Sequence, residues 1–232
     1  MAAANDLEKR SVMMATNRRT VPYIYMEDPS AFQGGYAVAT AKKKSMTPRK
    51  PRADAERNRS HLTEVAKKAF TERGSDVTLD EIAKRAGLGI GTLYRHFPTR
   101  AAMLQAIYRQ EVEQLADAAA VLLESMQPLE ALRAWLRLFV EYIGTKKIIV
   151  PALDAATGDN VALFEYSSTQ ITEAANQLVA RAIENGEIHE DTHALDLLFA
   201  VFGFSKTNDQ TDWTARAYRL IDILVAGVAR VR

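Results

Sequence analysis

Two short stretches of the sequence carry side chains whose types and spacing could do chemistry, and the first is residues 189–193, His-Glu-Asp-Thr-His. These residues have the H-E-x-x-H form of zinc hydrolases, in which two histidines one helical turn apart bind Zn²⁺ and the glutamate activates the bound water. Asn185 and Gly186 instead indicate a helix end just before the pattern, and Asp191 or Thr192 is a good N-cap for a helix beyond it. We therefore expect the pattern to straddle a loop and a helix start. We assign no catalytic residue, metal or cofactor, and a zinc hydrolase is kept as the weaker alternative.

The second stretch lies between Leu79 and Phe97 and could bind DNA. Residues 79–86 and 90–97 each have the apolar spacing of a short helix, and the sequence Ala-Gly-Leu-Gly joins them. Gly87 would supply the positive φ that so tight a turn requires. Such a helix-turn-helix places its second helix in the major groove of DNA, with the N-terminal residues toward the base edges. The candidate contact residues are Ile90, Thr92, Tyr94, Arg95 and His96, whereas Leu93 and Phe97 are expected to face inward.

Arg95 is the best candidate for reading a base, because an arginine can donate two hydrogen bonds to O6 and N7 of guanine. Each of these side chains also has a structural interpretation. Arg95 could be a solvated charge, Tyr94 could cover the surface of the domain, and His96 could be a hydrogen-bonded structural histidine.

The elements that must position this unit are also helical. An apolar stripe predicts a helix from about Arg57 that ends near Gly74; its members are Leu62, Val65, Ala66, Ala69 and Phe70. Thr78 and Glu81 have the spacing of a capping box, in which each side chain bonds the other's backbone N–H. Thr99 is a good cap for a long helix that ends near Pro128 and buries Leu104, Ile107, Leu115, Ala118 and Leu122.

The rest of the chain indicates an all-α protein. Apolar stripes recur over residues 132–143 and 161–185, and two final segments, 192–205 and 213–230, are apolar on more than one face. We find no strand alternation, no apolar run long enough to span a membrane and no signal-peptide pattern. The absence of cysteine excludes disulfides and thiolate metal sites. We expect a cytoplasmic protein without a membrane partner.

Charge is distributed unevenly and suggests three parts. Residues 1–53 carry a net charge of +6, residues 54–100 carry +2 and residues 101–232 carry −7. We interpret the first part as a flexible basic extension, with Met46 as a possible alternative start, the second as the DNA-binding domain and the third as a helical domain of different function. Five cations near the boundary could enter a minor groove or add non-specific affinity for DNA: Arg49, Lys50, Arg52, Arg57 and Arg59.

The segment TLDEIAKRAGLGIGTLYRHFPTRAAML, which begins at Thr78, resembles the DNA-binding signature of the TetR family of transcriptional regulators. The similarity extends from about Arg57 to Leu104. It implies that Thr78 and Arg100 contact phosphates, and that the recognition helix reads DNA through Thr92, Tyr94 and His96. The sequence departs from the family at Gly89 and Ile90, where many members have serine and a polar residue. The capping hydroxyl is therefore missing, and Ile90 could instead contact a thymine methyl group.

The resemblance also implies the roles of the C-terminal domain. It would bind a small-molecule effector in a pocket lined by Met126, Trp135, Phe139, Tyr142, Phe164, Tyr166 and Gln170. It would form a homodimer through Leu198, Phe202, Leu220, Leu224 and Val228. For each of these residues, packing inside one protomer is the alternative. We expect a repressor of double-stranded DNA operators that its effector releases; control by a protein partner, and activation in place of repression, stay open.

Overall fold

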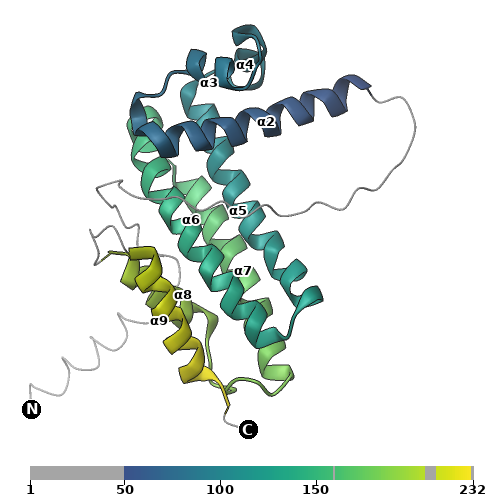
Figure 1. Cartoon of the computed structure of the whole chain (residues 1–232), viewed down its shortest axis with the longest axis vertical. Coiled ribbons are helices and arrows are strands. Elements are labelled where there is room, and N and C mark those ends of the chain that lie inside the picture. Colours follow the sequence, from purple (N-terminus) through teal and green to yellow (C-terminus); the bar gives the residue numbers. More distant parts are fainter. Residues whose placement is uncertain (1–49, 159, 207–212, 231–232) are drawn as a thin grey trace, which may run out of the picture.

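The computed structural model describes residues 50–158, 160–206 and 213–230, so the expectations for residues 1–49, including Met46 and Arg49, lie outside the described part. The described elements, shown in Figure 1, are α2 (Lys50–Arg73), a 3₁₀ turn η1 (Gly74–Asp76), α3 (Leu79–Arg85), α4 (Ile90–His96), α5 (Arg100–Ser125), α6 (Pro128–Thr157), α7 (Val161–Glu184), α8 (Ala194–Lys206) and α9 (Trp213–Val228). In this described part, strand-type pairing is limited to one bridge between Ile188 and Ala229. The expectation of an all-α fold is confirmed.

Helices α2, α3 and α4 form a small head at one end of the molecule, above the start of α5 (Figure 1). Gly74, with φ +62°, ends α2, and Gly87, with φ +67°, makes the turn between α3 and α4 as expected. The Thr78 hydroxyl accepts from the Glu81 N–H at 3.2 Å and caps α3. The second hydrogen bond of the expected capping box, from the Thr78 N–H to the Glu81 side chain, is replaced. The Glu81 carboxylate instead accepts hydrogen bonds from two arginines, Arg73 and Arg85.

The start of α2 differs from the prediction. The helix begins at Lys50, about two turns before the expected start at Arg57, and so includes the last residues of the segment predicted to be flexible. An apolar stripe marks only the packed part of a helix, and once that part is formed, adding a residue to its end costs little. A polar helical extension of this kind leaves no periodic signal in the sequence.

Helices α5, α6 and α7 pack along one another below the head, and α8 and α9 cover one side of this bundle (Figure 1). The Thr99 hydroxyl accepts from the Ala102 N–H at 3.0 Å and caps α5, as predicted. One continuous core runs from Leu62 and Phe70 in the head to Val225 in α9. None of the helices in the described ranges is both long and apolar enough to cross a membrane.

Candidate nucleic-acid interface and the core behind it

The recognition helix α4 is amphipathic in the predicted sense. Leu93 and Phe97 are completely buried, which confirms the inward face, while Ile90, Tyr94 and Arg95 are exposed. Tyr94 is 47% exposed, which is a large exposed fraction for an aromatic side chain. Figure 1 places α4 at the outer end of the head. The exposed side chains are therefore available to an external surface, whereas the apolar ones fix the rotation of the helix.

Thr92 and His96 are only half exposed, and the backbone C=O of His96 is used within the protein. Gly89 occupies the N-cap of α4 and provides no side-chain cap, as its lack of a hydroxyl requires. The exposed Arg95 makes no ion pair with the described residues, whereas Arg73 and Arg85 on the neighbouring elements pair with Glu81. Arg95 is thus a cation on the outward face whose charge is not neutralised within the described protein.

Arg100, which the resemblance assigns to a phosphate, faces the interior of the head in this structure. Its guanidinium donates to the C=O of Val77 and lies 4.7 Å from the centre of the Phe70 ring. Burial lowers the pKa of Arg100, although Asp76 acts in the opposite direction, and the group still carries its charge at neutral pH. Arg100 therefore ties the first residue of α5 to the segment that precedes α3. A phosphate contact by Arg100 or Thr78 stays a prediction.

Two side chains of α2 bind the C-terminal ends of the two helices of the helix-turn-helix, α3 and α4. Arg59 donates from Nη1 to the C=O of His96 at 3.0 Å, and Nε2 of His61 donates to the C=O of Ala86 at 3.2 Å. Because a carbonyl only accepts, the His61 ring must carry its proton on Nε2. Sequence reasoning missed these contacts and placed Arg59 among the cations of a DNA-binding arm. Contacts between residues 37 and 25 positions apart leave no local spacing signal.

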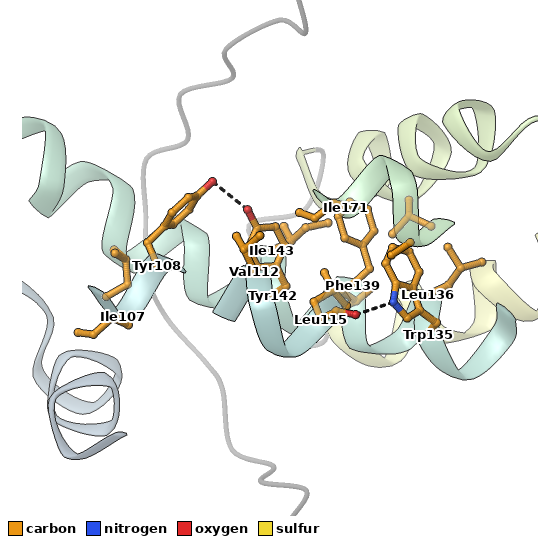
Figure 2. Close-up of a cluster of buried hydrophobic side chains, with 14 of the residues drawn as sticks. Ile107, Tyr108, Val112, Leu115, Trp135, Leu136, Phe139, Tyr142, Ile143 and Ile171 are labelled. Carbon is orange, nitrogen blue, oxygen red and sulfur yellow. Dashed lines mark hydrogen bonds between the residues drawn. The ribbon is translucent and has the colours of Figure 1, made fainter. Parts of the chain in front are cut away.

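The core between α5, α6 and α7 brings together three aromatic rings that the sequence singled out (Figure 2). The rings of Trp135 and Phe139 stack with centres 5.9 Å apart, and those of Phe139 and Tyr142 with centres 6.0 Å apart. The Trp135 indole N–H donates to the C=O of Leu115 in α5 at 2.7 Å. This row of rings runs along one face of α6 and connects α6 to α5.

Tyr108 of α5 joins this row and was not predicted from the sequence. Its hydroxyl lies 2.9 Å from those of both Tyr142 and Ser167. Ser167 donates its proton to the C=O of Phe164, so Tyr108 must donate to Ser167 and Tyr142 must donate to Tyr108. Burial raises the pKa of Tyr142 well above its usual value, which keeps that proton in place. The chain of hydroxyls has one direction and joins α6, α5 and α7.

Other residues of the expected effector pocket lie elsewhere. Met126 is exposed at the C-cap of α5, and Gln170 contacts Glu173 of its own helix. Tyr166 donates to Glu113 at 3.4 Å, on the flank of α7. Phe164 meets the Tyr108 ring edge-on, with centres 5.6 Å apart. The structure therefore gathers Trp135, Phe139, Tyr142 and Phe164, and it leaves the other three apart.

Comparisons with known proteins cover both parts of the chain. Residues 62–107 match the family profile described as bacterial regulatory proteins, tetR family, and residues 127–230 match the profile of a transcriptional regulator SbtR-like, C-terminal domain. The crystal structure of a TetR transcriptional regulator from Streptomyces coelicolor is 37% identical, with a TM-score of 0.66, over 75% of this chain and 99% of that one. The chain belongs to the TetR family.

Further relatives of this TetR-family regulator agree. A TetR transcription regulatory protein from Mycobacterium vanbaalenii is 30% identical over 77% of this chain and 99% of its own, with a TM-score of 0.65. Helix-turn-helix transcriptional regulators of Staphylococcus aureus are 36% identical over 63 residues, which is 27% of this chain and 34% of theirs. The match thus spans about a third of the length of those relatives. The chain is a DNA-binding transcriptional regulator.

The expected dimer residues of this regulator are mostly turned toward its own core. Leu198 is buried, and Phe202, Leu224 and Val228 are half-buried and packed against the core. Leu220 is half-buried. The large apolar side chains that α8 and α9 expose in the described ranges are Leu195 at 46%, Phe199 at 49% and Ile223 at 68%. The sequence indicated apolar residues on more than one face of both helices, which did not distinguish the inner face from the outer one.

The H-E-x-x-H letters lie entirely in the loop before α8, which begins at Ala194. The expected N-cap at Asp191 or Thr192 was wrong, because the C=O of His193 accepts from the N–H groups of Asp196 and Leu197. Glu190 pairs with Arg230 at 2.9 Å, and this loop is tied to the end of α9. Among the described residues, no group of three histidine, cysteine or acidic side chains could hold a metal ion.

A chain of polar contacts runs from α9 into α6. Arg137 donates from Nη2 to both carboxylate oxygens of Asp222, at 2.8 and 3.1 Å, and its guanidinium lies 5.5 Å from the centre of the Tyr218 ring. Tyr218 in turn donates to Oε1 of Glu141 at 3.0 Å. These contacts fix α9 to the middle of α6.

Glu141 lies where the head meets the bundle. Lys67 of α2 pairs with the buried Glu111 of α5 at 2.7 Å, and both act electrostatically on Glu141. Burial raises the pKa of the Glu141 carboxyl, and Glu111 adds to this, although Tyr218 and Lys67 act in the opposite direction. Because the folded state holds this proton more tightly than the unfolded chain, the stability it contributes is present below the ordinary pKa of 4.5 and is lost as the pH rises through the folded pKa.

Glu141→Gln removes this titration while keeping an acceptor for Tyr218. We expect the variant to gain stability relative to the wild type as the pH rises above the ordinary pKa of 4.5, because only the wild type must ionise a half-buried carboxyl there. Denaturant unfolding at equal protein concentration measures the difference, and Glu184→Gln on the exposed surface is the control. A stability difference that does not change with pH, or that changes in the opposite direction, contradicts the prediction.

Proposed function

We propose that this regulator is a repressor that binds its operator as a homodimer and is released by a small-molecule effector. The observation that carries the proposal is the outward face of α4. Tyr94 and Arg95 are exposed on that face, while Leu93 and Phe97 are buried and hold the helix to the head. We assign residues 54–100 to DNA binding and residues 101–232 to effector binding and dimerisation, with residues 1–53 as an extension. The proposed DNA contacts are Thr78, Gly89, Ile90, Thr92, Tyr94, Arg95, His96 and Arg100.

Within this set, Arg95 is proposed to read a guanine and Ile90 a thymine methyl group. Arg95 is exposed and makes no ion pair with the described residues, so little internal interaction is lost when it turns toward a base. Ile90 is partly exposed at the first position of α4, where a recognition helix comes nearest to the groove floor. An isoleucine there contributes apolar contact and no hydrogen bond.

The homodimer is proposed to form through the outer face of α8 and α9. Leu195, Phe199 and Ile223 expose apolar surface there, with half-buried Phe202 and Leu220 on the same two helices. An exposed apolar surface of this kind favours association, and a two-fold axis through it brings identical faces together. Two recognition helices would then meet half-sites about one turn of DNA apart, roughly 34–36 Å.

The effector is proposed to bind in the core that contains Trp135, Phe139, Tyr142 and Phe164. Helix α5 begins at Arg100, four residues after the end of α4, and carries Tyr108 into that core. A ligand that displaces Tyr108 would move the same rigid helix that supports the head. The effector would then favour a population whose recognition helices are wrongly spaced for the operator.

A reporter assay tests repression and release together. DNA selected from a random library by the full chain is placed between a promoter and a reporter gene. We expect expression to fall when the regulator is present, and aromatic small molecules that raise its melting temperature to restore expression. Increased expression would show an activator. Repression that no small molecule relieves, but that a captured protein does, would replace the effector with a protein partner.

A further inference from the structure

We propose that Arg59 is a positioning residue for the recognition helix and not a phosphate contact. This inference rests on the proposed role of α4 in reading DNA. Arg59 lies on α2, outside the helix-turn-helix itself. Its guanidinium contacts the C=O of His96, the last residue of α4, and the ring of Phe97, the C-cap residue that follows it. The contacts define how the end of α4 is held and which way its exposed face points.

The first contact satisfies a backbone group that a helix end leaves open. His96 is the last residue of α4, and the last carbonyls of a helix have no partner within the helix. Nη1 of Arg59 donates to the His96 C=O at 3.0 Å, and the positive charge also suits the negative end of the helix dipole. With only seven residues, α4 is too short to be stable without such tertiary contacts.

The second contact fixes the side chain beside that carbonyl. Cζ of Arg59 lies 4.5 Å from the centre of the Phe97 ring, and Phe97 is completely buried. A planar guanidinium can stack on a ring and donate to a neighbouring carbonyl at the same time, which the ammonium of lysine does less well. Since α4 is about 10 Å long, a small rotation at this end displaces Tyr94 and Arg95 relative to the bases.

Arg57 provides a matched control on the same helix. It is an exposed arginine two residues before Arg59, and its ion pair in the described part is with Asp54 of α2. Replacing Arg57 removes one positive charge from the same region of the head without changing a contact to α4. A difference between Arg57 and Arg59 variants therefore reports on position and not on charge.

The experiment compares Arg59→Met, Arg59→Lys and Arg57→Met with the wild type. Fluorescence anisotropy gives the affinity for selected and for scrambled DNA over a range of salt concentrations. For Arg59→Met we expect about a tenfold loss of affinity for selected DNA and little change in affinity for scrambled DNA. The slope of the logarithm of the binding constant against the logarithm of the salt concentration, here called the salt slope, should be unchanged. Arg59→Lys is expected to be intermediate. For Arg57→Met we expect equal selectivity to the wild type.

Hydrogen exchange of the α4 amides gives a readout that does not depend on DNA. We expect exchange in α4 to become faster in Arg59→Met and to stay as in the wild type in Arg57→Met. If the wild type proves not to bind DNA selectively, the proposed function fails while this readout still tests Arg59. If Arg59→Met does not fold, Arg59→Lys supplies the same comparison.

Two results would overturn the proposal. A salt slope that falls by about 0.9, with equal losses on selected and scrambled DNA, would show that Arg59 neutralises a phosphate. Unchanged exchange in α4 together with unchanged selectivity would show that Arg59 does not position the helix.

Discussion

A regulator that carries both Phe199→Asp and Ile223→Asp is expected to be monomeric and to bind its full operator about 10²- to 10⁴-fold more weakly. Both side chains are exposed on the outer face of α8 and α9. Burying each in a dimer would contribute about 1.5–3 kcal/mol per side chain, whereas burying an unpaired carboxylate is strongly unfavourable. In a dimer, binding of one recognition helix to its half-site raises the effective concentration of the other helix at the second half-site. A monomer loses this gain in affinity.

Light scattering gives the mass in solution, and anisotropy gives the affinity for full and half operators. Val161→Asp serves as the matched control, because Val161 is an exposed apolar residue on α7, which is not one of the two helices of the proposed interface. The control should stay dimeric with wild-type affinity. A double variant that is still a dimer would place the interface elsewhere, and an equal loss on the half operator would show that the head itself was damaged.

Arg95→Ala is expected to weaken binding to selected DNA by about 1–3 kcal/mol, which is roughly 5- to 150-fold, and to relax the preference at one base pair. Arg95 is exposed on the outward face of α4, and its removal leaves the buried anchors Leu93 and Phe97 unchanged. The folded protein should therefore keep its stability while its selectivity falls. Tyr94→Ala is expected to act in the same direction.

Selection of binding sites from a random library by the variant and by the wild type shows which position loses its preference. Lys84→Ala is the control for charge, since Lys84 is an exposed cation on α3. A uniform loss of affinity on all DNA with a reduced salt slope would identify Arg95 as a phosphate contact instead. No change in the selected sequence or in affinity would remove Arg95 from the interface.

The local features of the head could be predicted because their signals lie within a few residues. Thr78 and Thr99 each cap a helix through an N–H three residues ahead, and Gly87 has the positive φ that the turn requires. Leu93 and Phe97 are four residues apart and share the buried face of α4. Each of these predictions depends on helical periodicity or on turn geometry, which a sequence displays directly.

The contacts that hold these elements together could not be predicted in the same way. Tyr108 and Ser167 are 59 residues apart, and Arg59 and His96 are 37 apart, so their hydrogen bonds depend on how the helices pack. Leu198 shows a related difficulty on α8. It is as apolar as the exposed Leu195 on the same helix, and composition alone does not distinguish the face turned to the core from the face turned outward.

The most direct test of the account is the affinity of the full chain for a DNA sequence selected from a random library, measured against a scrambled version of the same length. Anisotropy is followed at several salt concentrations with non-specific competitor present. We predict affinity for the selected sequence at least about 10³-fold higher than for the scrambled one. Equal affinity for the two sequences, or no binding at low salt, would contradict the claim that α4 reads a specific operator.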